Sequence, residues 1–139
     1  MTIRVSTIIP AFNSAATLRA AIDSALAQEF EGQEILVVND GSTDGTRAIV
    51  AGYGDKIRVI EHTNRGFNRS RNAAIRIARG EYFAFLDAGD FWLTGRLALK
   101  RCVSALHFFS EPELYDRMLQ PRNFRRMIRT GNSSADRQD

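Results

Sequence analysis

The chain has 139 residues, of which 44% are hydrophobic and 25% are charged, a balance typical of a globular domain. No apolar run reaches the roughly 18 residues that a membrane-spanning helix needs, and the N-terminus lacks the apolar segment of a signal peptide. The single cysteine, Cys102, excludes an internal disulfide framework, and we therefore expect a cytoplasmic protein.

The net charge of +3 is distributed unevenly along the chain. Residues 1–97 carry 11 Lys and Arg against 11 Asp and Glu, whereas residues 98–139 carry 8 against 5. The first 97 residues are therefore neutral overall and lack the basic surface typical of nucleic-acid-binding domains. We expect no nucleic-acid partner, and we assign any tendency to bind anionic surfaces to the tail.

The first element expected from the N-terminus is a strand over Val5–Ile9. Pro10 is expected to end this strand, because proline cannot donate a hydrogen bond to a sheet ladder. Asn13 or Ser14 is expected to cap the helix that follows. Apolar residues recur at spacings of three and four over residues 18–26, which predicts a helix with one buried face.

The next part of the chain repeats this alternation of strand and helix. A second strand is expected over Glu34–Asn39, an apolar run typical of strands buried on both faces. Residues 40–45, rich in Asp, Gly, Ser and Thr, predict a turn that leads into a helix over residues 46–53. A third strand is expected over Ile57–Glu61, followed by a turn at residues 64–66.

A helix over Ser70–Arg79 and a fourth strand over Tyr82–Leu86 complete the pattern. Strand and helix thus alternate three times with short connections, which predicts a doubly wound, mostly parallel α/β sheet. For this sheet we expect the strand order 3-2-1-4. In such sheets ligands bind outside the carboxyl ends of the strands. Residues 10–13, Asp40 and residues 87–90 should therefore meet in one crevice.

Four side chains at this crevice each permit two interpretations. Asp40 could accept a hydrogen bond from the imide of uracil or from a ribose hydroxyl, or it could begin an Asx turn. Phe12 could stack on a base or belong to the core. Asp87 and Asp90 could bind a divalent cation and its phosphates, or could form an ordinary polar turn.

Five arginines and no acidic residue lie between residues 65 and 79. Arginine is suited to bidentate recognition of phosphate oxygens. We expect Arg71 to be directed at a diphosphate, and the other four arginines to form a solvated surface.

Several chemistries are not supported by any motif. The chain lacks a G-x-x-x-x-G-K-[ST] loop and a G-x-G-x-x-G fingerprint, which argues against NTPase and dinucleotide functions. His62 and His107 stand alone without ligands at metal-binding spacing, and no Ser-His-Asp or Cys-His arrangement is evident.

Five motifs follow one another in order at residues 6–13 (Ser-Thr-Ile-Ile-Pro-Ala-Phe-Asn), 37–46 (Val-Val-Asn-Asp-Gly-Ser-Thr-Asp-Gly-Thr), 64–66 (Asn-Arg-Gly), 70–73 (Ser-Arg-Asn-Ala) and 80–88 (Gly-Glu-Tyr through Leu-Asp-Ala). Together they closely resemble the inverting family-two glycosyltransferases of GT-A fold. The resemblance extends over about residues 3–97. It implies a three-layer, Rossmann-like domain that binds a nucleotide-diphosphate sugar, most often a UDP-sugar.

The resemblance also implies roles for individual residues, which are the candidate nucleotide-binding residues of this chain: Pro10, Ala11, Phe12, Asp40, Arg71, Asp87 and Ala88. Residues 10–12 and Asp40 would hold the base, Arg71 would lie near the diphosphate, and residues 87–88 would lie near the ribose or the metal. Mg²⁺ or Mn²⁺ is the implied cofactor, with Asp87 and Asp90 as ligands. Gly89 stands where the family usually has a third acid.

The family's acceptor site and general base lie in a second half, beyond the residues that match here, and the chain is in this sense truncated. Glu111, Glu113 and Asp116 do not match that base, so no catalytic residue is identified. The acceptor, a hydroxyl of an unknown glycan, lipid or small molecule, is not predicted further.

The chain divides into a donor-binding domain over residues 1–97, a helical basic extension over residues 98–129 and a disordered tail over residues 130–139. The alternative to a complete enzyme is a catalytically incomplete donor-binding module that acts with a partner chain or as a homo-oligomer. In that case the basic tail would dock to a protein or to the inner face of a membrane.

Overall fold

The computed structural model describes residues 3–97 and 128–129. Its strands form one parallel sheet in the order β3-β2-β1-β4-β5, so the expected order of the first four strands is confirmed. The strands are β1 (Val5–Ala11), β2 (Gln33–Asp40), β3 (Arg58–His62), β4 (Tyr82–Phe85) and the two-residue β5 (Ile128–Arg129).

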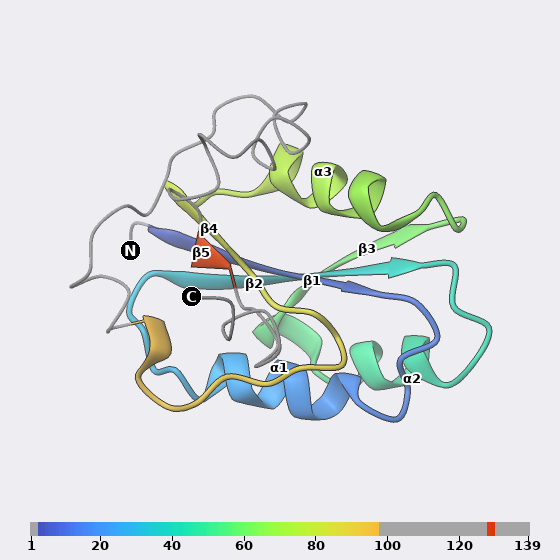
Figure 1. Cartoon of the computed structure of the whole chain (residues 1–139), viewed down its shortest axis with the longest axis horizontal. Helices are drawn as coiled ribbons and strands as arrows, with labels where there is room; N and C mark the ends of the chain where they lie inside the picture. The colour runs from blue at the N-terminus through green and yellow to red at the C-terminus, as the bar shows by residue number, and fades with distance from the viewer. Residues whose placement is uncertain (1–2, 98–127, 130–139) are drawn as a thin grey trace, which may run out of the picture.

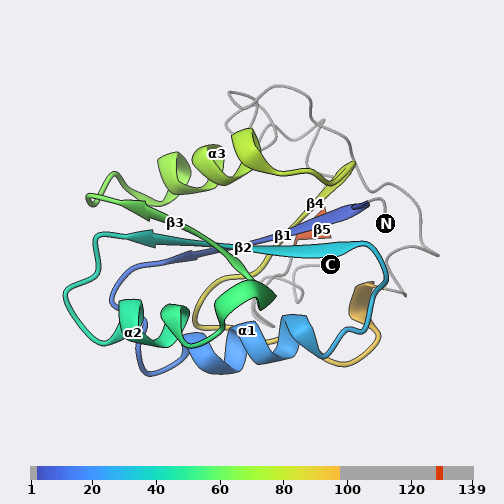
Figure 2. The same ribbon diagram turned by 180° about the vertical axis from the view of Figure 1, so that it is seen from behind.

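The sheet is the middle of three layers (Figures 1 and 2). Helix α3 covers one face, and helices α1 and α2 cover the other. The helices are α1 (Leu18–Leu26), α2 (Thr46–Ala51), the short 3₁₀ helix η1 (Gly54–Lys56) and α3 (Phe67–Ile77). The α/β class predicted from the alternating pattern is therefore confirmed.

The central strands are buried on both faces, as their apolar runs predict. Ile35 and Val37 of β2 pack toward α1 and α2, whereas Leu36 and Val38 pack toward α3. Each core gains one row of side chains from every central strand, because successive strand residues point to opposite faces.

The expected end of β1 at Pro10 is wrong, because β1 continues through Ala11 and pairs with β2 as far as Asn39. The carbonyl of Ile8 accepts a hydrogen bond from Leu86 N, so the backbone of Ile8 points toward β4. The backbone nitrogen of Pro10 points to the same side, but it lies beyond Ile8–Phe85, which is the last pair between β1 and β4. Its missing N–H is therefore not needed by any strand.

Asn13 and Ser14 do not cap α1 with their side chains, so that expectation is also wrong. Thr17 is the N-cap residue and makes no side-chain capping bond; instead Ser14 O accepts hydrogen bonds from the amides of Thr17 and Leu18. The Asn13 side chain is used elsewhere, because its Oδ1 accepts from Thr43 N at 2.8 Å.

Helix α3 begins one turn earlier than its apolar spacing suggested. Gly66 precedes it with φ of +92°, a conformation that favours glycine, and Gly66 O accepts the first helical hydrogen bond from Ser70 N. The helix ends at Ile77, because Ala78 is extended and turns the chain back toward β4.

A buried cluster closes the sheet at the amino ends of its strands. Glu34 accepts hydrogen bonds from Ser6 Oγ at 2.5 Å, from Arg79 N at 2.6 Å and from Arg58 Nη1 at 2.8 Å. Burial would raise the pKa of Glu34, but these hydrogen bonds and the Arg58 charge outweigh it and lower that pKa. Gly80 packs against Ser6 so closely that a Cβ would lie 2.6 Å from Ser6 N.

Of the proposed basic extension, only Ile128 and Arg129 are described, and they are extended rather than helical. The expected helices elsewhere in residues 98–127, Cys102 and the tail over residues 130–139 lie outside the described residues. In the part of the chain that the structure describes, no helix is both long enough and apolar enough to cross a membrane.

Candidate functional site

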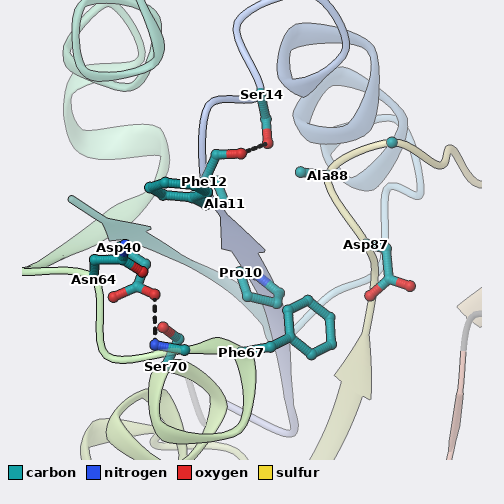
Figure 3. Close-up of a pocket in the computed structure, with 12 residues that line it drawn as sticks. Pro10, Ala11, Phe12, Ser14, Asp40, Asn64, Phe67, Ser70, Asp87 and Ala88 are labelled. Atoms are coloured by element: carbon teal, nitrogen blue, oxygen red, sulfur yellow. Dashed lines mark hydrogen bonds between the residues drawn. The ribbon is translucent and has the colours of Figure 1, made fainter. Parts of the chain in front are cut away.

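A pocket of about 450 Å³ opens at the carboxyl edge of the sheet, at the ends of β1, β2 and β4 (Figure 3). This volume lies within the range of small-molecule sites, roughly 300–1,000 Å³. The pocket contains every candidate nucleotide-binding residue except Arg71: Pro10, Ala11, Phe12, Asp40, Asp87 and Ala88. The convergence expected from the strand order is therefore present, except that Asn13 and Asp90 are not among the residues that line the pocket.

Asp40 lies at the end of β2 and is only 5% exposed. Its Oδ1 accepts a hydrogen bond from Arg65 N at 2.7 Å, and its Oδ2 accepts from Gly66 N at 2.9 Å. The carboxylate thus fixes the β3–α3 loop against the pocket. Because each carboxylate oxygen can accept two hydrogen bonds, both retain capacity for a ligand.

Both carboxylate oxygens of Asp40 bond to the β3–α3 loop and not to the amide of Ser42, which an Asx turn at Asp40 would use. Asn39 Oδ1 accepts a hydrogen bond from Ser42 N at 3.3 Å. The Asx-turn interpretation of Asp40 is therefore wrong. Asp40 instead points to the pocket side of the β2 end, where Figure 3 shows its bond to the β3–α3 loop.

Two aromatic rings line the pocket from different elements. Phe12 follows β1 and Phe67 begins α3, and each is 48% exposed. A large apolar side chain gains stability from burial, so two half-exposed rings in one pocket are available to cover a planar ligand. The interpretation of Phe12 as a core residue is wrong.

Arg71 is held behind the pocket wall. It is only 5% exposed, its guanidinium lies 3.6 Å from the centroid of the Phe67 ring, and its Nη2 donates to Asp87 Oδ1 at 2.7 Å. The charge of Arg71 therefore acts on the pocket chiefly through Asp87 and Phe67. The expected direct approach of Arg71 to a diphosphate stays a prediction.

Asp87 and Asp90 are the carboxylates that could hold a divalent cation. The Asp87 side chain is 41% exposed, and burial together with the Asp87 charge raises the pKa of Asp90. A bound cation would relieve this repulsion between like charges. Within residues 3–97 and 128–129, no group of three or more His, Cys, Asp or Glu side chains is placed to bind a metal.

Two carboxylates fit Mg²⁺ or Mn²⁺ only if the ligand completes the shell. Mg²⁺ in phosphate-transfer sites is held by one or two carboxylates plus substrate phosphates and water, which matches Asp87 and Asp90. Gly89 between them lines the pocket, and no atom would lie within 4 Å of a Cβ built there. The site therefore has space for phosphate oxygens.

The loop that carries Phe12 is held by the neighbouring β2–α2 loop. The amide of Asn13 donates to Ser42 Oγ at 2.9 Å, that of Ser14 donates to Thr46 Oγ1 at 2.9 Å, and that of Ala15 donates to Asp44 Oδ2 at 3.1 Å. Hydrogen bonds from the Thr46 hydroxyl and amide lower the pKa of Asp44. The polar residues of the 40–46 turn therefore position the pocket wall.

Sequence reasoning missed five residues of the pocket: Ser14, Asn64, Gly66, Phe67 and Ser70. Asn64 and Gly66 belong to a turn that was expected, but no local pattern places this turn at the pocket. The signal that could have found it is Asp40, a carboxylate that needs donors once it is buried.

Comparison with known proteins identifies the family of this chain. The family model described as glycosyl transferase family 2 matches residues 6–109. The chain is 34% identical over 113 residues to UDP-Glc:alpha-D-GlcNAc-diphosphoundecaprenol beta-1,3-glucosyltransferase WfaP of Escherichia coli, covering 80% of this chain and 43% of WfaP.

Two solved structures share the fold. S. aureus TarS 1-349 in complex with UDP-GlcNAc has a TM-score of 0.65 and 29% identity, covering 73% of this chain and 30% of TarS. Mannosyltransferase PcManGT from Pyrobaculum calidifontis, in complex with GDP-Man and Mn²⁺, has a TM-score of 0.60 and 31% identity, covering 66% of this chain and 29% of PcManGT.

The chain thus spans less than half the length of each of these proteins. The matched segment nevertheless contains strands β1 to β4 apart from Val5, the helices around them and the pocket at their carboxyl ends. On this evidence the chain belongs to glycosyl transferase family 2 and carries the N-terminal part of its GT-A fold.

Proposed function

We propose that the pocket binds the nucleotide of a UDP-sugar, and that the chain is the donor-binding part of an inverting glycosyltransferase. The observation that carries this proposal is the pairing of a buried carboxylate, Asp40, with a half-exposed ring, Phe12, in one pocket. The presence of UDP-GlcNAc in the TarS structure and of UDP-Glc in the name of WfaP supports the choice of nucleotide.

Asp40 and the aromatic rings account for recognition of the base. The imide N–H of uracil is a donor, and the Asp40 carboxylate is an acceptor whose remaining lone pairs can receive it. The planar base would stack on Phe12, with Phe67 on another side of the pocket. A guanine base presents a different edge and a larger ring, so the pocket should favour UDP over GDP.

Asp87 and Asp90 account for binding of the diphosphate. With Mg²⁺ or Mn²⁺ bound, the cation would offset the charge that develops on the diphosphate as the sugar leaves. Arg71 supports this arrangement by fixing the Asp87 carboxylate at 2.7 Å. Asp90 must lose its proton to serve as a ligand, and burial together with the Asp87 charge opposes that loss by raising the pKa of Asp90.

The transfer step itself needs one group outside this pocket. The acceptor oxygen attacks the anomeric carbon opposite the diphosphate, the bond from that carbon to the phosphate oxygen breaks, and the configuration inverts. The hydroxyl proton must pass to a base. Asp40 is bound by two amides and Asp87 by Arg71, so we assign the base to a part of the enzyme beyond residue 97.

A titration of UDP and GDP, with and without Mn²⁺, tests the donor site. We expect UDP to bind with a dissociation constant below about 1 mM, within the usual range for enzyme substrates, and more tightly than GDP. Phe12→Ala should weaken UDP binding without lowering stability, because the ring is half exposed. Phe91→Ala, at an exposed ring outside the pocket, is the matched control. Absence of UDP binding at millimolar concentration would refute the proposal.

A donor-binding module that acts with a partner is the second candidate. Phe91 is 66% exposed and Leu93 is 74% exposed, and both follow closely after Asp90 in the sequence. Large exposed apolar side chains that lie together often mark an interface. The test is whether the chain releases UDP from UDP-glucose only when an acceptor is added. Release at about 1 s⁻¹ or faster would show that the chain is a complete enzyme. Donor binding without such release would favour the module.

We also propose peripheral contact with a membrane. The name of WfaP specifies an acceptor linked to diphosphoundecaprenol, a lipid carrier. An enzyme that acts on a lipid-linked acceptor must work close to the bilayer surface. Co-sedimentation of the full chain with vesicles that contain anionic lipid measures this contact.

A further inference from the structure

A second hollow, of about 560 Å³, lies between helix α3 and the edge strand β3. Its wall contains three arginines, Arg65, Arg69 and Arg76, together with His62 and Asn72. No residue of this wall belongs to the donor pocket. We call this hollow the arginine groove.

The groove collects positive charge because of helical spacing. Arg69 and Arg76 are seven residues apart, so they lie on the same face of α3, whereas Arg71 points to the core side. Residues 63–80 contain five arginines and no acidic residue. The α3 segment therefore has no carboxylate of its own to neutralise this face.

The nearest acidic residue along the chain does not neutralise the groove either. Glu61 alternates with His62 on β3, and its carboxylate contacts Asn39 and Arg47 instead. In the part of the chain that the structure describes, no salt bridge involves Arg65 or Arg69. Both are exposed, so their guanidinium groups are accessible from solvent.

Two polar atoms of the groove residues also lack partners. His62 Nδ1 and Asn72 Oδ1 are buried, and neither forms a hydrogen bond within residues 3–97 and 128–129. Buried polar atoms without a partner cost stability unless water or a ligand satisfies them. The exposed guanidinium groups of Arg65 and Arg69, which form no salt bridge within the described residues, are the groups of this groove that can bind an anion.

We propose that the arginine groove binds phosphate groups of an anionic ligand at a second site, separate from the donor pocket. The planar guanidinium groups of Arg65 and Arg69 match phosphate oxygens in bidentate geometry. Ile60 and Ile77 add apolar wall beside them, so the ligand can carry a nonpolar portion next to its phosphate. Phosphate of this kind is found in a free phosphorylated molecule and in a phospholipid headgroup.

This site does not depend on the proposed function. The two pockets share the turn at residues 64–66, where Asn64 and Gly66 face the donor pocket and Arg65 faces the groove. Phosphate could bind in the groove even if the donor pocket bound no UDP. Signals from the two sites must therefore be read separately.

Binding at the two sites can be separated by titrating the full chain with inorganic pyrophosphate and monitoring the chemical shifts of the backbone amides by NMR. We expect saturable shifts at residues 69–77 of α3, beside any shifts at Ala11 and Phe12. Substituting both Arg65→Gln and Arg69→Gln should weaken the α3 response about tenfold or more, because two charged hydrogen-bonding groups are lost. The control carries Arg4→Gln and Lys56→Gln, which remove the same charge from exposed positions elsewhere.

Vesicles distinguish the two sources of phosphate. The first set contains phosphatidylcholine alone and the second adds phosphatidylglycerol, each tested by co-sedimentation with the three proteins. Binding to the anionic vesicles that only the Arg65/Arg69 variant loses would identify a lipid headgroup as the ligand. Saturable pyrophosphate shifts without such vesicle binding would identify a free phosphorylated molecule.

Two results would overturn the proposal. One is the absence of both pyrophosphate shifts in α3 and anionic vesicle binding. The other is an equal loss of binding in the Arg65/Arg69 variant and in the Arg4/Lys56 control, which would mean that only net charge matters. Folding of each variant is checked from the fluorescence of the single tryptophan, Trp92, which is buried.

Discussion

Arg71 Nη2 lies 2.7 Å from Asp87 Oδ1, and this contact joins helix α3 to the end of β4. The Arg71 side chain is 6% exposed, whereas that of Asp87 is 41% exposed. Asp87 can therefore lose its partner and still be solvated, but Arg71 cannot. The pair couples the stability of α3 to the position of a candidate metal ligand.

We expect Arg71→Gln to lower the free energy of unfolding by about 1–3 kcal/mol, the usual cost of disrupting a buried hydrogen-bonded group. It should also weaken UDP binding in the presence of Mn²⁺, because Asp87 loses its fixed orientation. Urea denaturation followed by Trp92 fluorescence measures the first effect. Arg69→Gln, on the exposed face of the same helix, should change stability by less than about 0.5 kcal/mol. Equal effects of the two substitutions would contradict a role for the Asp87 contact.

Asp40→Ala should weaken UDP binding by about 1–3 kcal/mol, since the base would lose a buried hydrogen-bonding partner. It should also lower stability, because the amides of Arg65 and Gly66 lose their acceptor. Calorimetry gives the dissociation constant, and denaturation gives the stability. Asp55→Ala, at an exposed carboxylate of η1, is the control. An unchanged dissociation constant would remove Asp40 from the base site and leave it a purely structural role.

Gly89→Asp should increase the effect of Mn²⁺ on UDP affinity by about tenfold, because it adds a charged oxygen ligand to the shell. The substitution fits, since the φ of Gly89 is not positive and a Cβ there meets open space. Gly89→Asn has the same shape without the charge and should behave like the unmodified chain. Strong Mn²⁺ dependence that Gly89→Asp does not increase would mean that Asp87 and Asp90 suffice.

Glu34 should make stability depend on pH in the acid range. Its pKa in the folded state is lowered below the ordinary value of 4.5, so the folded state releases the proton more easily than the unfolded chain does. The stabilisation is fully present above about pH 4.5 and is lost as the pH falls through the folded pKa. The free energy of unfolding, measured by denaturation, should differ less between pH 7 and pH 3 in Glu34→Gln than in the unmodified chain. The exposed control Glu29→Gln should retain the full difference.

Most of the fold could be predicted from local pattern. The run from Ile35 to Val38 predicts a strand buried on both faces, and α1 and α2 with α3 supply those two faces. The strand order 3-2-1-4, which we expected for a doubly wound sheet of this kind, is confirmed. The carboxyl-edge crevice followed from that order, which is why Phe12, Asp40 and Asp87 were predicted to meet.

The rest depended on contacts between distant residues. Asn13 has the residue type of a helix cap, but a backbone amide 30 positions away, that of Thr43, takes its side-chain oxygen. Pro10 has the residue type of a strand end, but it lies where no partner strand needs its N–H. Phe67 and Ser70 enter the pocket only because Asp40 holds the preceding loop. Local propensity contains none of this information.

The central position of β1 has a consequence for synthesis of the chain. β1 pairs with β2 on one side and with β4, some seventy residues later, on the other. A nascent chain that ends before Tyr82 therefore exposes one complete edge of an apolar strand. Such edges pair readily with other chains. The nascent chain should therefore need chaperones until β4 has emerged from the ribosome. Fragments that end before residue 82 should aggregate.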